Sequence, residues 1–170
     1  DAVLELAEHY PFARALVNSG RLSRPCAYAD SPLNTADADS FPPAVGPGCT
    51  APDVPIRLHG RPGWLLHLLG DDFTLLLDGA VAPEQAGPLA AALAPLLERH
   101  PDLRLALLAP TQPALEALPR TTLVDDCEAL VRNRYHLEAG SAYLLRPDQH
   151  VAARWRQDRK STRLNSSHYQ

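Results

Sequence analysis

The stretch Phe73-Thr-Leu-Leu-Leu77 decides the fold, together with a similar run later in the chain, Leu103-Arg-Leu-Ala-Leu-Leu-Ala109. Apolar runs of this length without alternation indicate strands buried on both faces of a sheet. The Ala- and Leu-rich residues 83–100 between them have the apolar spacing of an amphipathic helix, carried by Leu89, Leu93, Leu96 and Leu97. Pro88 suits the first position of this helix, and Pro95 should kink it. A strand, a helix and a strand make a βαβ unit with a right-handed crossover.

The residues after this unit complete a small sheet. Residues 110–119 predict a short turn, Thr121–Val124 a brief strand and Cys127–Leu137 a helix. Two apolar runs, Ala142–Leu145 and Val151–Trp155, flank a Pro-Asp turn and predict a hairpin. The order β-α-β, α, β-β predicts an α/β fold with a mixed sheet and a thioredoxin-like outline.

The N-terminal third has a different composition. Residues 1–18 predict a helix to about His9, a break at Tyr10-Pro11 and a further turn or two ending near Gly20. The Pro- and Gly-dense residues 21–63 are too long for a loop inside a compact domain and predict an extended connector. We expect it to lie on a neighbouring surface, one that this chain lacks, with a short edge strand at 56–59. Trp64–Leu69 predicts one or two helical turns closed by Gly70.

Composition limits the classes of function. The 170 residues carry a formal net charge of −4, which argues against a nucleic-acid-binding face, and no apolar run is long enough to cross a membrane. The three cysteines, Cys26, Cys49 and Cys127, form no Cys-x-x-Cys, so neither a redox dithiol nor a zinc knuckle is indicated. Unpatterned thiols fit a reducing compartment, and we expect a cytoplasmic protein.

Both ends of the sequence differ from those expected of an intact protein. The chain begins at Asp1 and contains no Met, which predicts a fragment of something longer. Residues 158–168, DRKSTRLNSSH, look like a sequencing-adapter oligonucleotide translated in one frame. Residues 158–170 are therefore treated as an artefactual, disordered tail and excluded from the fold.

Several stretches together resemble a known family. Residues 141–155, Ser-Ala-Tyr-Leu-Leu-Arg-Pro-Asp-Gln-His-Val-Ala-Ala-Arg-Trp, look like the C-terminal signature of FAD-dependent aromatic hydroxylases. That family includes phenol, pentachlorophenol and hydroxyphenylpropionate monooxygenases and relatives that act on polyketides or rifampicin. Further similarity lies at 10–21, 31–34, 47–56 and 64–78, so the resemblance spans about residues 1–157.

The resemblance implies a division of the chain. Residues 1–20 would end the FAD- and substrate-binding domain, 21–63 would be the connector, and 64–157 a thioredoxin-like C-terminal domain without redox cysteines. Whole members of the family use FAD, NAD(P)H and O2 to hydroxylate an aromatic small molecule. Their Gly-x-Gly-x-x-Gly fingerprint and later Gly-Asp motif are absent here, so no catalytic, cofactor-binding or metal-binding residue is assigned, and the fragment alone is expected to be inactive.

The implied role is structural and interfacial. The expected partner is the N-terminal FAD-binding domain, with a homodimer left open and no nucleic acid or membrane involved. Two alternatives remain: a stand-alone thioredoxin-like binding module without redox activity, and a flavoenzyme of another reaction type on the same scaffold, such as an oxidative decarboxylase or epoxidase.

Local signals are interpreted as structural. Arg146 and Asp148 could touch a substrate or the flavin domain, but a turn in which Asp148 bonds backbone amides and Arg146 meets a carboxylate is favoured. Gln149 stands where the family usually has Gly, at a cost of roughly 1 kcal/mol if that position needs a positive φ. The turn should survive. Trp64 and Trp155 are expected to be packing anchors, or, if exposed, to mark the contact with the flavin domain.

The remaining chemistry-bearing residues lack the patterns of sites. The lone Gly-x-Gly in Val45–Thr50 follows no strand and indicates a bent connector rather than a phosphate cradle. The pairs Asp71-Asp72 and Asp125-Asp126 are expected to cap element ends, and Cys127 lacks an adjacent base. The histidines have no metal-ligand spacing and are expected to be surface or capping residues: His9, His59, His67, His100, His136 and His150.

Overall fold

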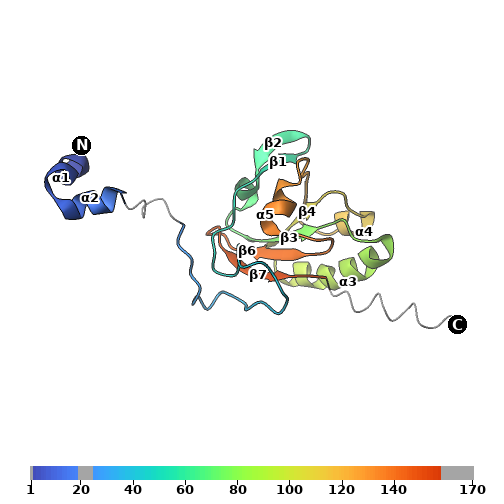
Figure 1. The fold of residues 1–170 in the computed structure, drawn as a ribbon. Helices are drawn as coiled ribbons and strands as arrows, with labels where there is room; N and C mark the ends of the chain where they lie inside the picture. The colour runs from blue at the N-terminus through green and yellow to red at the C-terminus, as the bar shows by residue number, and fades with distance from the viewer. Residues whose placement is uncertain (1, 19–24, 158–170) are drawn as a thin grey trace.

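A five-stranded mixed sheet organises the C-terminal part of the computed structural model, which describes residues 2–18 and 25–157. The strand order is β5-β4-β3-β6-β7 (Figure 1). The central strand β3 is parallel to β4 and antiparallel to β6, and β7 is antiparallel to β6. The strands span Phe73–Asp78 (β3), Leu103–Leu108 (β4), Thr121–Val124 (β5), Ala142–Leu145 (β6) and Val151–Trp155 (β7). The predicted βαβ unit and hairpin are confirmed.

Helix α3 (Pro83–Arg99) is the crossover of the βαβ unit and runs through Pro88 and Pro95. It begins five residues before Pro88, so the predicted start was wrong. Pro83 occupies the first turn, where the missing backbone N–H costs nothing because no carbonyl precedes it to accept a bond. Leu97 of this helix is fully buried, but the neighbouring Leu96 is 39% exposed.

Each face of the sheet carries its own apolar cluster. On one face, α3 and the short α4 (Pro113–Glu116) pack on the leucines that alternate along β3 and β4. On the opposite face lie the 3-10 helix η2 (Leu65–Leu68) and α5 (Leu130–Tyr135). Figure 1 shows the sheet between α3 on one side and α5 on the other. The strands therefore have apolar side chains on both faces, which is why their sequences do not alternate.

A two-stranded hairpin precedes the main sheet. β1 (Pro55–Leu58) pairs with β2 (Arg61–Trp64). The strand expected at 56–59 is confirmed except at its end, because His59 lies in the turn. Trp64, predicted to start a helix, instead ends β2, and the helix that follows is a single 3-10 turn. The two turn residues, His59 and Gly60, have φ of 50° and 76°, the conformation that closes a tight hairpin.

Two further boundaries differ from prediction. The helix expected over 127–137 is confined to Leu130–Tyr135, because Ala129 and His136 at its ends have φ of 54° and 50°. The turn expected over 110–119 contains the one-turn helix α4.

Two short helices form the N-terminal part, α1 (Ala2–His9) and α2 (Pro11–Asn18). The break predicted at Tyr10-Pro11 is confirmed, whereas the end near Gly20 lies outside the described residues. Among the helices of the described residues, none is long and apolar enough to span a membrane.

The stretch of the connector that precedes β1, residues 25–54, lies along the β6–β7 hairpin of its own domain. Backbone hydrogen bonds join Thr35 N to Ala152 O, Gly48 N to Val151 O and Ala51 N to Gln149 O, at 2.7–2.8 Å. The expectation that this segment wraps an absent neighbour is therefore wrong for these residues. The physical reason is that β7 is an edge strand with free backbone groups, which the connector satisfies.

Candidate functional site

A buried ionic cluster lies at the carboxyl end of β3. Arg132 of α5 donates from Nε to Asp78 Oδ2 at 2.7 Å and from Nη2 to Asp78 Oδ1 at 3.0 Å. It also donates to Ala109 O at 2.8 Å and lies 3.8 Å from Asp126 Oδ2. The side chains of Asp78 and Asp126 are 2% and 1% exposed, so one guanidinium neutralises two buried carboxylates only in part.

The same cluster fixes the start of α5. Asp126 accepts hydrogen bonds from the backbone of Val131 and Arg132, both at 3.0 Å, which confirms the capping role predicted for this residue. The hydrogen bond to Asp78 raises the pKa of Arg132 despite the opposing effect of burial. With its carboxylates held by backbone and guanidinium donors, this cluster ties α5 to β3 and β4 rather than presenting a free acid or base.

The turn from β3 into α3, residues 79–82, contains no cysteine. In redox proteins built on a βαβ unit, this turn is the usual place for Cys-x-x-Cys. Gly79 lies so close to β4 that a Cβ there would be 2.8 Å from Leu108 O. The turn is thus packed against the sheet and carries no nucleophile.

The Arg-Pro-Asp turn joins β6 to β7 and is closed by its own side chains. Arg146, 8% exposed, donates to Asp148, and the Asp148 carboxylate accepts from His150 N at 3.3 Å. Burial opposes ionisation, but the Arg146 guanidinium holds the pKa of Asp148 below its ordinary value. Gln149 has a φ of 64°, so the position does require the left-handed conformation, and its N–H still bonds to Arg146 O at 3.0 Å. The predicted turn is confirmed.

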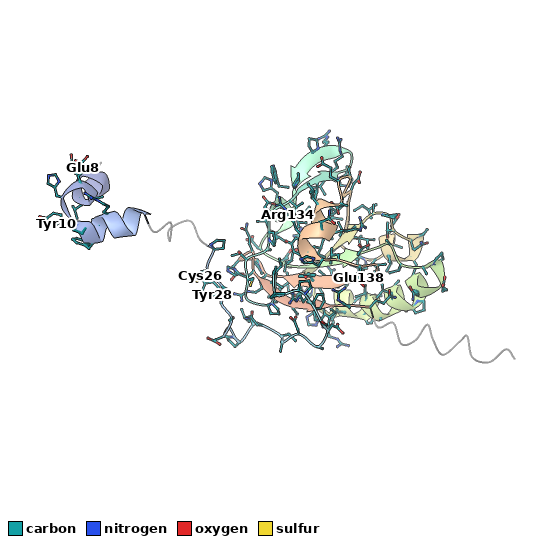
Figure 2. All side chains as sticks on the ribbon, viewed as in Figure 1. Glu8, Tyr10, Cys26, Tyr28, Arg134 and Glu138 are labelled. Atoms are coloured by element: carbon teal, nitrogen blue, oxygen red, sulfur yellow. The ribbon has the colours of Figure 1, made fainter. Side chains whose placement is uncertain are left out.

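His150 contradicts its prediction as a surface or capping residue. It is 9% exposed, its Nε2 lies 3.2 Å from Cys26 O, and its ring packs at 4.8 Å from that of Tyr28. Figure 2 shows Cys26 and Tyr28 at the margin of the domain. Sequence reasoning missed this because the partner segment lies more than a hundred residues earlier in the chain.

Arg154 of β7 forms the second anchor of the connector. It donates twice to Asp37, and to the carbonyls of Ala44 and Val45 at 2.9 and 3.2 Å. Two guanidinium groups lie over the Phe41 ring, that of Arg154 at 4.4 Å and that of Arg156 at 4.6 Å from its centroid. Arg154 was predicted only as part of the strand Val151–Trp155, and the one available signal was a charged residue inside an apolar run.

The Gly-x-Gly of the connector is a turn pressed against Tyr28. Gly48 has a φ of 85°, and a Cβ on it would be 2.5 Å from Tyr28 O. Its backbone is committed to β7 and to this contact, so the interpretation as a bent connector is confirmed.

Other predicted residues are dispersed. Asp72 pairs with Arg104 of β4 at 2.5 Å, with both side chains partly exposed. The hydrogen bond to Asp125 raises the pKa of the exposed Cys127 thiol, the opposite of what activates a nucleophile. Within residues 2–18 and 25–157, no group of three or more His, Cys, Asp or Glu side chains is placed to hold a metal ion.

Two hollows open on the surface of the domain. One, of about 490 Å³, is lined by residues 27–31, Arg146 and Asp148. The other, of about 620 Å³, is lined almost wholly by apolar side chains beside α3. A flavin dinucleotide needs donors for its pyrophosphate. Among its lining residues, the first hollow has carboxylates and an arginine already paired with Asp148, and the second has His100 and Trp155 as side-chain donors. Neither lining contains a free arginine or lysine side chain for the pyrophosphate.

Both tryptophans are exposed, Trp64 by 47% and Trp155 by 39%. Neither is the buried packing anchor that the sequence predicted first. Trp155 lines the apolar hollow beside α3.

Comparison with solved structures places this fold. A structure of the flavin-dependent monooxygenase PieE with FAD and substrate aligns with 91% of this chain at a TM-score of 0.57 and 17% identity. An uncharacterised conserved protein from Geobacillus kaustophilus aligns with 71% at a TM-score of 0.51 and 14% identity. Aklavinone-11 hydroxylase, in a complex with FAD and aklavinone, covers 82% at a TM-score of 0.48 and 26% identity.

The chain has a thioredoxin-like α/β fold with a mixed five-stranded sheet, as predicted. The chain spans 29% of the length of PieE and 23% of that of aklavinone-11 hydroxylase, and the described region is not an FAD-binding domain. The alignment covers 76% of the Geobacillus protein. No protein-family model matches the sequence. No curated protein matches it either.

Proposed function

We propose that this chain is the C-terminal part of a flavin-dependent monooxygenase that hydroxylates an aromatic substrate with FAD, NAD(P)H and O2. Within that enzyme, residues 64–157 form a structural and interfacial domain, residues 21–63 the connector, and residues 1–20 the end of the FAD- and substrate-binding domain. The domain performs no chemistry itself and contacts the FAD-binding part of the parent protein.

The observation that carries this proposal is the construction of the Arg-Pro-Asp hairpin. This hairpin is the most specific part of the family resemblance, and its side chains bind the connector. Arg146 donates to Ser31 at 3.3 Å as well as to Asp148, and His150 contacts Cys26. In the proposed parent protein, the connector follows the FAD-binding domain. A hairpin that holds the connector therefore also fixes the position of that domain.

The βα turn supports a role without redox chemistry. Residues 79–82 provide no thiol, and the carboxylates beside them are held by Arg132 and by backbone donors. The fold similarity to PieE agrees with the proposal, although at 17% identity it supports the fold only.

Two measurements test this proposal: flavin binding by the isolated chain, and the sequence of the gene upstream of Asp1. The isolated chain should be free of FAD after purification and should not oxidise NADPH. The reading frame extended upstream in the source DNA should encode Gly-x-Gly-x-x-Gly after a first strand, and the extended protein should bind one FAD. Stoichiometric flavin on the isolated chain would contradict the proposal, as would an upstream frame without a flavoprotein.

A second candidate is a stand-alone thioredoxin-like binding module without redox activity. One observation favours it: the alignment with the Geobacillus protein covers 76% of that chain, so a protein of comparable size has this fold. An initiating codon just before Asp1 would decide for this candidate.

A further inference from the structure

His150 lies between the Arg-Pro-Asp turn and β7, and each nitrogen of its ring faces a backbone carbonyl. Nδ1 is 2.9 Å from the carbonyl oxygen of Asp148, and Nε2 is 3.2 Å from that of Cys26. Nδ1 is also 3.4 Å from the carboxylate of Asp148. The first carbonyl belongs to the turn and the second to the connector, so the ring joins these two segments.

The two carbonyls distinguish the charge states of the ring. A carbonyl oxygen only accepts hydrogen bonds, and a neutral imidazole has a single N–H group. The neutral ring can therefore satisfy one carbonyl, and its other nitrogen then directs a lone pair at an acceptor. A ring turned over by half a turn would place C–H groups at both carbonyls and satisfy neither. The imidazolium donates to both, so the observed geometry is complementary to the charged ring.

The groups around the ring act in opposite directions. Burial, which leaves His150 9% exposed, opposes a positive ring, as does the guanidinium of Arg146. The Asp148 carboxylate and the two carbonyl acceptors favour it. The Tyr28 ring packs against the imidazole at 4.8 Å. The turn and the two connector stretches that contact His150 contain these titratable or charged groups: Arg146, Asp148, Cys26, Tyr28, Asp30 and Cys49.

Loss of one ring proton would affect the two contacts unequally. The carbonyl of Asp148 is the nearer acceptor and lies in the same turn, so a neutral ring keeps its hydrogen on Nδ1. Nε2 then has a lone pair that faces the carbonyl of Cys26. Deprotonation therefore breaks the contact with the connector, whereas the turn stays closed through the pairing of Arg146 with Asp148.

We propose that His150 is a proton-dependent latch, which holds the connector at residues 26–28 to the hairpin when both ring nitrogens carry hydrogen. Figure 2 shows Cys26 and Tyr28 where the connector reaches the sheet domain. The attachment is complete at low pH and weakens as the pH rises through the titration of the ring. Release is local, because Arg154 continues to hold the connector through Asp37. The inference does not rest on the proposed function.

Hydrogen exchange of the full 170-residue chain tests the latch. Tyr28 N–H donates to Gly48 O at 2.8 Å and reports on the attachment beside His150. Its protection factor, corrected for the intrinsic pH dependence of exchange, should fall about tenfold between about pH 5 and 8. Nitrogen-15 shifts of the ring should show, over the same range, a change from two N–H groups to one. Thr35 N–H, bonded to Ala152 O, is the internal control and should stay protected.

Two neutral replacements separate a proton latch from a purely structural contact. The amide nitrogen of His150→Gln can take the place of Nε2 and donate to Cys26 O at any pH. That of His150→Asn reaches only the place of Nδ1. His150→Gln should keep the protection of Tyr28 without a pH dependence, whereas His150→Asn should lower it about tenfold at every pH. His67→Asn, at an exposed position of η2, is the matched control and should leave the original pH profile unchanged.

Several results would overturn the latch. Equal losses of protection in His150→Gln and His150→Asn would show that packing of the ring matters and the donor at Nε2 does not. A ring whose charge stays the same over the whole range would contradict the proposal, as would a ring that titrates while Tyr28 stays equally protected. Loss of protection at Thr35 in step with Tyr28 would show that the whole connector detaches, and a local latch would then be wrong.

Discussion

Arg154 of β7 and Asp37 of the connector are joined by two parallel hydrogen bonds, from Nε at 2.9 Å and from Nη2 at 2.7 Å. The Arg154 side chain is only 3% exposed, so its charge depends on this partner and on the carbonyls of residues 44 and 45. The hydrogen bond to Asp37 raises the pKa of Arg154, although burial acts against it. The connector thus supplies the counter-charge of an arginine in the sheet.

Removal of this counter-charge should loosen the connector. In Asp37→Ala, the buried guanidinium of Arg154 loses its carboxylate, at a cost of about 2–3 kcal/mol in the free energy of unfolding by urea. A protease should cut within residues 35–45 at a rate higher than the rate at which the sheet unfolds, because the connector is released while the sheet stays folded. Asp72→Ala breaks the more exposed pair with Arg104 and should cost at most about 1 kcal/mol. Similar losses in the two variants would show that the connector is not held by this pair.

The cluster at the carboxyl end of β3 predicts strong coupling between its members. Arg132→Met leaves Asp78 and Asp126 buried without a cation and should cost about 3–5 kcal/mol. Asp78→Asn should remove much of that penalty when it is combined with Arg132→Met, because one of the two uncompensated charges is gone.

A double-mutant cycle measures this coupling. Urea unfolding of the two single variants and the double variant should give an interaction free energy of about 2 kcal/mol. Additive losses would mean that Arg132 stabilises α5 through packing of its aliphatic stem alone.

The sequence predicted the elements of the sheet well because local apolar runs define them. Phe73–Leu77 and Leu103–Ala109 are apolar runs typical of strands buried on both faces, and the Pro-Asp turn indicated the hairpin. Errors fell at element ends. Ala129 and His136 adopt a positive φ, although neither is a glycine, so nothing in the sequence indicated these helix ends. Helix α3 begins at Pro83 rather than at Pro88.

The contacts of the connector could not be predicted from the sequence. Proline density argued against long helices in this segment, but it contains no information about which surface an extended segment covers. Arg154 contacts Asp37, and His150 contacts Cys26, over separations of more than a hundred residues. The exposure of Leu96 was missed for a related reason: periodicity shows that a helix has an apolar face, but not whether every part of that face meets a partner.

Gln149 predicts a stabilising substitution. Its φ of 64° is strained for a residue with a Cβ, so Gln149→Gly should raise the free energy of unfolding by about 0.5–1 kcal/mol. Glu128→Gly, at an exposed position without positive φ, should lower stability through the added freedom of the unfolded chain. Both values can be read from urea midpoints. A loss of stability in Gln149→Gly would indicate that the side chain contributes more than its backbone strain costs.

Two buried tyrosines predict alkaline unfolding. Tyr135 donates its hydroxyl to Pro52 O at 2.8 Å, Tyr143 donates to Tyr135 O at 2.7 Å, and their rings meet edge to face. Burial is the main cause that raises the pKa of each phenol above the ordinary value of 10.0. A raised pKa in the folded state means that the proton is held more tightly there than in the unfolded chain. The resulting stability is fully present below about pH 10 and is lost as the pH rises above it.

Ultraviolet absorbance of tyrosinate, recorded with circular dichroism, measures this directly. Two of the five tyrosines should ionise only as the sheet unfolds. Tyr143→Phe should cost about 1 kcal/mol at neutral pH through the lost hydrogen bond and should move the alkaline unfolding to higher pH. Tyr28→Phe, at a half-exposed position, should leave that transition unchanged. Ionisation of all tyrosines with the circular dichroism signal intact would show that the two phenols reach solvent in the folded protein, and that their hydrogen bonds do not tie α5 to the connector and the sheet.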